Sequence, residues 1–118
     1  MWARASSLRE GSVLIVGGGI GGPSAAIALR NVGYDVNVVE VRPDLHSSVY
    51  GVGIIQPVNA LRALEAIGCA EACLAAGYST KAWGQLLDVD GKLVREMPGA
   101  RIPGSDLPPM NGLTRPQV

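Results

Sequence analysis

The chain has 118 residues and a formal net charge of zero, with 10 lysines and arginines against 10 aspartates and glutamates. This length allows one domain at most, and no basic stripe of the kind that binds nucleic acid is visible. No apolar run approaches the roughly 20 residues that cross a bilayer, and residues 1–11 lack the apolar segment of a secretory signal, which predicts a short exposed leader.

The first predicted element is a strand over residues 12–16, an apolar run typical of a parallel strand covered on both faces. A glycine-rich turn follows, and then a helix that starts at about residue 19 or 20 and ends at Val32, with Gly33 as its C-terminal cap. The helix stripe predicted to face the sheet consists of Ala25, Leu29 and Val32, with Ala28 beside it.

A second strand is predicted over residues 36–39, parallel to the first because a helix connects them. Residues 42–49 are predicted to be a polar loop, and residues 51–57 a flexible apolar stretch. Two helices follow, at about residues 58–67 and 70–76; Gly68 and Gly77 mark their ends.

Residues 83–89 and 92–97 flank Asp90-Gly91 and predict a hairpin whose two turn residues both have positive φ. Residues 98–112 are rich in proline and glycine and are predicted to be loop. Residues 114–117 resemble the start of a helix, with Pro116 at its first position. Because the chain ends there, we expect it to be the front piece of a larger enzyme.

The cysteines, Cys69 and Cys73, lie four residues apart on a predicted helix. Two cysteines without a wider framework indicate a reducing compartment, and we expect a cytoplasmic location. Zinc is disfavoured because His46 is the only histidine, so both cysteines are interpreted as small buried hydrophobic residues.

The spacing Gly17-x-Gly19-x-x-Gly22, between a strand and a helix, is the dinucleotide-binding fingerprint. The first glycine makes the tight turn, the second lets a pyrophosphate approach the backbone, and the third lets the helix pack on the strand. Ile20 and Gly21 open the helix, whose free N–H groups and positive dipole end suit phosphates.

Glu40 follows the second strand, eighteen residues after Gly22, and is predicted to accept hydrogen bonds from the ribose hydroxyls of an adenosine. Its carboxylate would repel a 2′-phosphate, which disfavours NADP at this site. The fingerprint alone does not choose between FAD and NAD.

The series of motifs resembles the class A flavoprotein monooxygenases, the single-component FAD-dependent aromatic hydroxylases. The resemblance covers nearly the whole chain from Ser12. The segments that carry it are residues 13–43, Gly51-Val52-Gly53-Ile54 leading to residues 57–64, the Asp90-Gly91 hairpin, and Leu113-Thr114-Arg115.

The resemblance implies roles for matching positions. Arg42, with Val41 beside it, matches a basic residue near the adenosine or pyrophosphate; a plain surface arginine is the alternative. The backbone around Gly53 would lie near the flavin, or else form an ordinary loop. Arg115 matches an arginine that contacts FAD before the following helix, and a guanidinium suits a pyrophosphate; a surface arginine is the alternative.

The predicted fold class is α/β: a Rossmann-like FAD-binding βαβ unit with an added β-hairpin, an incomplete domain over residues 12–118. The family's Gly-Asp segments and its substrate-shaping β-rich region are not found in these residues, and we assign no catalytic acid or base. We expect the isolated chain to be inactive, weakly stable and weak in FAD binding.

The resemblance implies an FAD-binding part of an enzyme that uses NAD(P)H and O2 to hydroxylate an aromatic or other ring-containing small molecule, with no nucleic-acid partner and no membrane span. Two alternatives stay open at this point. One is the front half of another FAD oxidoreductase, such as an epoxidase, halogenase or reductase. The other is an NAD-binding Rossmann module without catalysis.

Overall fold

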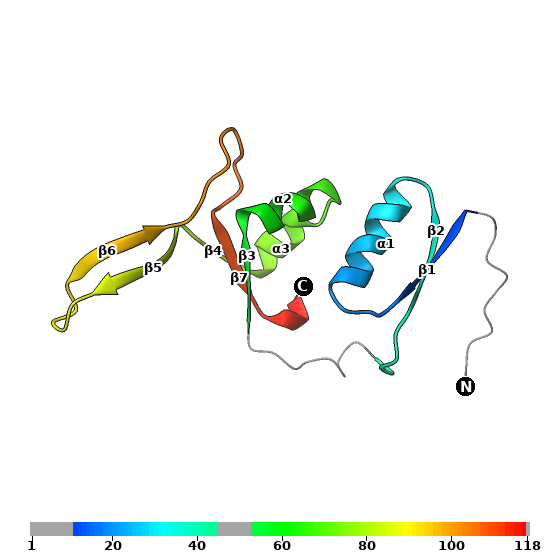
Figure 1. Ribbon diagram of the computed structural model, residues 1–118, viewed down its shortest axis with the longest axis horizontal. Helices are drawn as coiled ribbons and strands as arrows, with labels where there is room; N and C mark the ends of the chain where they lie inside the picture. Colours follow the sequence, from blue (N-terminus) through cyan, green and yellow to red (C-terminus); the bar gives the residue numbers. More distant parts are fainter. Residues whose placement is uncertain (1–10, 45–52, 118) are drawn as a thin grey trace. The chain divides into compact units, whose positions relative to one another are not determined.

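The computed structural model describes residues 11–44 and 53–117 (Figure 1). The chain divides into two compact units, residues 1–47 and 48–118. The first unit contains β1 (Ser12–Val16), α1 (Gly21–Asn31) and β2 (Asp35–Val39). The second contains β3 (Ile54–Pro57), α2 (Val58–Ala66), α3 (Ala70–Ala76), β4 (Tyr78–Thr80), β5 (Ala82–Leu87), β6 (Leu93–Pro98), β7 (Met110–Leu113) and the 3-10 turn η2 (Arg115–Gln117).

The first unit is a parallel βαβ unit, as the sequence predicts. β1 pairs in parallel with β2 over their whole length, from Ser12 opposite Asp35 to Val16 opposite Val39, and α1 connects them. Gly33 has a φ of 94° and its N–H donates to the carbonyl of Arg30 at 3.0 Å. This left-handed glycine ends the helix as expected.

The two-sided cover predicted for β1 is wrong, and the predicted stripe of α1 is wrong at Ala25 and Val32, whereas Ala28 and Leu29 are half-buried. Ala26 is the buried residue of α1, whereas Ala25 is exposed and Val32 keeps 71% of its surface exposed. Val16 of β1 is 81% exposed. The physical reason is that α1 packs on one face of a two-stranded sheet, and no second layer covers the other face within residues 11–44.

The second unit is organised around a three-stranded antiparallel sheet of order β3-β7-β4. Ile54 pairs with Leu113 on one side of β7, and Tyr78 pairs with Gly112 on the other. Helices α2 and α3 pack on each other and on this sheet. The core between them is formed by Val58, Leu61, Ala70 and Leu107.

Three predictions in this unit need correction. The stretch predicted as flexible contains strand β3, the segment predicted as loop contains the buried central strand β7, and β4 was not predicted. These strands have three or four residues each and carry proline, glycine or polar side chains. Pairing with distant residues, rather than a local pattern, therefore defines them. Gly51 and Val52 lie outside the described residues, as does His46.

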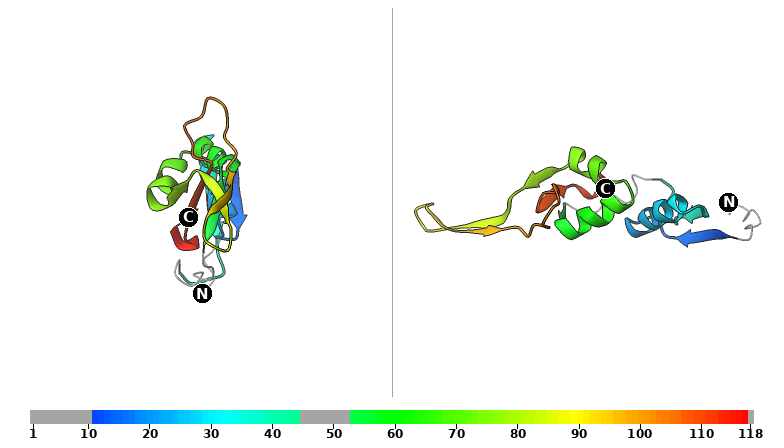
Figure 2. Two further views of the ribbon diagram at one scale, coloured as in Figure 1. Left: turned by 90° about the vertical axis from the view of Figure 1, so that its left-hand side faces the viewer. Right: turned by 90° about the horizontal axis from the view of Figure 1, so that it is seen from above.

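Strands β5 and β6 form the predicted antiparallel hairpin, which projects from the rest of the second unit as a two-stranded ribbon (Figure 2). The predicted turn is wrong in detail, because Gly91 has a positive φ of 80° but Asp90 does not. The Asp88 N–H donates to the Lys92 carbonyl at 2.9 Å, and its Oδ1 accepts from the N–H of Lys92 at 2.8 Å. Asp88 and Lys92 thus close the turn between β5 and β6, and Gly91 is the residue within it that has a positive φ.

Both predicted helices of the second unit are present, and Gly68, with a φ of 80°, follows the first of them. The predicted helix start at residue 114 is the 3-10 turn η2. Cys73 is buried as expected, whereas Cys69 is only half-buried, and both are free thiols. No helix within residues 11–44 and 53–117 is long and apolar enough to cross a membrane. The predicted leader, residues 1–11, lies almost entirely outside the described residues.

Candidate functional site

Two glycines of the fingerprint are required by the fold itself. Gly17 has a φ of 115°, which side chains of L-residues rarely tolerate, and its N–H donates to the Val39 carbonyl at 2.7 Å. A Cβ added at Gly22 would lie 2.0 Å from the Gly17 carbonyl oxygen. The turn after β1 therefore folds back against α1 only because both positions lack a side chain.

The middle glycine of the fingerprint is different. A Cβ added at Gly19 would meet nothing within 4 Å, and Gly19 does not have a positive φ. The same holds for Gly21. Neither glycine is explained by packing, because no atom of the described residues fills the space where a Cβ would stand.

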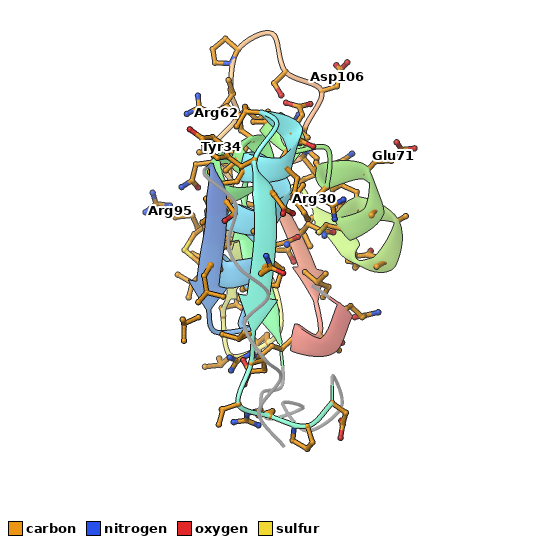
Figure 3. All side chains as sticks on the ribbon, turned by 90° about the vertical axis from the view of Figure 1, so that its right-hand side faces the viewer. Arg30, Tyr34, Arg62, Glu71, Arg95 and Asp106 are labelled. Carbon is orange, nitrogen blue, oxygen red and sulfur yellow. The ribbon has the colours of Figure 1, made fainter. Side chains whose placement is uncertain are left out.

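The N-terminus of α1 has the electrostatics of an anion site. Within the described residues no side chain caps this helix, and its first turn carries no acidic residue. Ile20 at the N-cap has helical φ and ψ, so the turn leads directly into the helix. Arg30 lies in the last turn, at the far end of α1 (Figure 3). The Gly22 N–H already donates to the Gly19 carbonyl at 3.0 Å and Pro23 has no N–H. What this end of α1 offers a phosphate is therefore the positive dipole end together with the backbone of the turn before it.

Glu40 lies just after β2, and its carboxylate is fixed against the glycine turn. The N–H of Gly18 donates to Oε2, and the N–H of Arg42 donates to Oε1 at 2.9 Å. These bonds lower the pKa of Glu40 below its ordinary value of 4.5: the Arg42 N–H contributes most, then the Gly18 N–H, then the Val41 N–H and the positive charge of Arg42. Glu40 is consequently a charged acceptor at neutral pH.

Sequence reasoning did not single out Gly18. A Cβ there would come within 3.0 Å of Glu40 Oε2, so the glycine lets the carboxylate approach the turn closely. The signal that could have revealed it is the acidic residue after the second strand, since the ends of two adjacent parallel strands lie side by side.

The structure places eight predicted site residues in the first unit, at the carboxyl ends of β1 and β2. They are Gly17, Gly19, Ile20, Gly21, Gly22, Glu40, Val41 and Arg42. Val41 is 95% exposed, so no described residue covers it. This edge of a parallel sheet is where such folds bind ligands.

The other two predicted site residues, Gly53 and Arg115, lie in the second unit. Gly53 precedes β3 and Arg115 follows β7. Ile54 pairs with Leu113, and a Cβ at Gly53 would lie 3.7 Å from the Leu113 carbonyl oxygen. The two residues therefore flank the same end of the β3-β7-β4 sheet, and Arg115 is exposed there.

These features fit an adenine dinucleotide: an open glycine turn, an uncapped helix N-terminus and a charged carboxylate after the second strand of a parallel pair. The fold and this site define a dinucleotide-binding protein of the Rossmann class. The chain belongs to the family described as FAD binding domain, whose sequence profile matches residues 10–114.

Among curated relatives, the chain is 39% identical over 103 residues to "Putative FAD-dependent monooxygenase YetM" of Bacillus subtilis (strain 168), covering 87% of this chain and 27% of that protein. It is 37% identical over 86 residues to 3-hydroxybenzoate 6-hydroxylase of Polaromonas naphthalenivorans (strain CJ2), covering 73% of this chain and 21% of that protein. These matches confirm the resemblance to flavin-dependent monooxygenases.

Among solved structures, the chain is similar to a variant of 2-methyl-3-hydroxypyridine-5-carboxylic acid oxygenase, with a TM-score of 0.67 and 29% identity. The match covers 88% of this chain and 25% of that one. The chain thus spans about a quarter of the length of the relatives it matches. The likeness confirms the predicted α/β class with its Rossmann-like βαβ unit.

Proposed function

We propose that this chain binds the ADP half of FAD and forms the N-terminal part of a flavin-dependent monooxygenase. The observation that carries the proposal is the open space at Gly19, which no packing within the described residues explains. A pyrophosphate seated there would lie against the backbone of the glycine turn and face the positive dipole end of α1. The matched family and the named relatives support FAD as the occupant.

The neighbouring residues take their roles from this placement. Glu40 is the acceptor for the adenosine ribose, because its two oxygens together have more lone pairs than the backbone N–H groups occupy. Val41 and Arg42 lie beside the adenosine and pyrophosphate. Gly53 and Arg115 contribute from the second unit, the first by allowing backbone to approach the cofactor and the second by offering a guanidinium to it.

When bound, FAD supplies the redox chemistry, which we propose uses NAD(P)H and O2 to hydroxylate an aromatic or other ring-containing small molecule. The names of the relatives, 3-hydroxybenzoate 6-hydroxylase and the pyridine carboxylic acid oxygenase, support this class of substrate. In this proposal the residues of this chain bind and orient the cofactor. Residues 12–118 form part of the FAD-binding domain of a cytoplasmic enzyme, preceded by the leader, residues 1–11.

Gly19→Ala tests the proposal, because its Cβ would meet no protein atom but would enter the proposed pyrophosphate space. We expect the fold to be unchanged and FAD affinity to fall about tenfold or more, since tenfold corresponds to only about 1.4 kcal/mol. The measurement is an FAD titration followed by flavin fluorescence, with NAD and ADP as competing ligands.

Gly84→Ala is the matched control. It lies in β5, and its added Cβ would meet only the flexible end of Met97 at 3.4 Å. Its FAD affinity should equal that of the unmodified chain. Full FAD affinity in Gly19→Ala, or binding of NAD in preference to FAD, would contradict the proposal.

A further inference from the structure

Two side-chain amides from the β7–η2 segment satisfy carbonyls in the last turn of α3. Asn111 Nδ2 donates to the Cys73 carbonyl at 2.8 Å, and Gln117 Nε2 donates to the Ala76 carbonyl at 3.1 Å. The last four carbonyls of a helix have no partner within it. The end of α3 is therefore held by the segment that carries Arg115.

The oxygen of the Gln117 side chain closes a second set of contacts. Oε1 accepts from both the N–H and the Oγ1 of Thr114, each at 2.8 Å. The Gln117 N–H donates to the Thr114 carbonyl at 3.0 Å. Thr114 and Gln117 are thus joined through backbone and side chain, and Arg115 lies between them.

We propose that Gln117 is a positioning residue for Arg115: it fixes the backbone of the 114–117 turn against the end of α3 and so sets where the guanidinium emerges. This inference rests on the proposed role of Arg115 toward FAD. Gln117 itself is not expected to touch the cofactor. A positioned guanidinium loses less side-chain and backbone freedom on binding than one on a loose turn.

A purely structural role for Gln117 is the competing explanation. In that case the amide only caps α3, and its loss lowers stability without changing how Arg115 meets FAD. Two readouts separate the explanations. One is the dissociation constant for FAD, and the other is the hydrogen-exchange protection of the Thr114 N–H, which needs no cofactor.

The test uses the full chain and Gln117→Met, which keeps a long unbranched side chain but removes both amide functions. We expect the Thr114 N–H to lose its protection and FAD affinity to fall about fivefold to tenfold, approaching the loss from Arg115→Gln, because a charge-assisted contact is weakened. In the double variant the two losses should not add, because both act through the same guanidinium.

One control variant and one pair of Thr114 variants keep the result interpretable. Gln85→Met replaces an exposed glutamine of the hairpin and should change neither readout. Thr114→Val removes one donor to Gln117 and should weaken FAD binding less than Gln117→Met does. Thr114→Ser keeps the hydroxyl, so its FAD affinity should equal that of the unmodified chain.

The outcomes distinguish this inference from the proposed function. If Arg115→Gln leaves FAD affinity unchanged, the role proposed for Arg115 is wrong, and the positioning role falls with it. If Arg115→Gln weakens binding but Gln117→Met lowers only the melting temperature, or if the two losses add, the positioning role alone is overturned. Retained protection of the Thr114 N–H in Gln117→Met would overturn it without any ligand.

Discussion

Each of the two units of this chain is stabilised by a different set of internal interactions. In the described part of the first unit, Ala26 is the one buried hydrophobic residue, and strand pairing, glycine contacts and the carboxylate of Glu40 define the geometry. The second unit has an aliphatic core around Leu61 and a fully buried polar side chain, Asn111. The comparison teaches that most of the proposed ligand contacts come from the unit with the smaller core.

The largest difference in stability between the two units is expected from the variant Asn111→Ala. Asn111 is 0% exposed and donates to the Cys73 carbonyl and to Gln56 Oε1. Its removal leaves both acceptors buried without that donor, so we expect the second unit to lose about 3 kcal/mol of stability. Urea unfolding measured by the hydrogen exchange of individual amides would report each unit separately.

Asn59→Ala, at an exposed position of α2, is the matched control and should change stability little. The amides of β1 and β2 should be unaffected in Asn111→Ala. Parallel loss of protection in both units would show that they do not respond independently.

The converse variant is Gly22→Ala, which should break the first unit and spare the second. Its Cβ would lie 2.0 Å from the Gly17 carbonyl oxygen, so α1 has to move away from the turn. We expect a loss of about 2 kcal/mol in the first unit, the usual size for forced overpacking, together with weaker FAD binding. The exchange rates of the α1 amides measure the loss.

Gly21→Ala is the control for the fold, because its Cβ meets nothing within 4 Å and alanine favours a helix by up to about 1 kcal/mol over glycine. Its α1 amides should be protected at least as well as in the unmodified chain. If the α1 amides exchanged at the same rate in Gly22→Ala as in Gly21→Ala, the close contact between the turn and the helix would not contribute to the stability of the first unit.

The smallest effect is a pH dependence confined to the first unit. Because the pKa of Glu40 is lowered in the folded chain, its contribution to stability is complete above the ordinary pKa of 4.5 and is lost as pH falls below that value toward the folded pKa. Melting between pH 7 and pH 3 should show this loss for the unmodified chain.

In Glu40→Gln the first unit should not show this loss of stability at acid pH. Glu65→Gln, an exposed carboxylate of α2, serves as the control and should retain it. An unchanged acid profile in Glu40→Gln would show that the bonds from Gly18 and Arg42 do not stabilise the unit.

The features that the sequence predicted well are local ones. The first strand, the glycine turn, the helix and the second strand follow one another within residues 12–39, and their order specifies a parallel βαβ unit. Gly33 and Gly68, which follow α1 and α2, were equally predictable because each acts through its own positive φ. Gly77 follows α3 without a positive φ.

The features that the sequence did not reveal depend on distant partners. Strand β7 carries Gly112 and the polar Asn111, and neither indicates a strand until Gln56 and Ser79 are seen to contact Asn111. The contact of Gly18 with Glu40 spans 22 residues, and that of Gln117 with the Ala76 carbonyl spans 41. Such pairings have no periodic signature in the chain.

The central place of β7 has a consequence for biosynthesis. β3 and β4 each pair with β7 and not with each other, so neither gains its sheet neighbour before residues 110–113 have been made. While the hairpin and the segment that follows it are being synthesised, α2 and α3 can form. The hydrogen bond from Asn111 to Gln56 Oε1 cannot form yet, because Asn111 has not been added. Completion of the second unit therefore waits for β7, the last strand to be synthesised, because β3 and β4 form only by pairing with it.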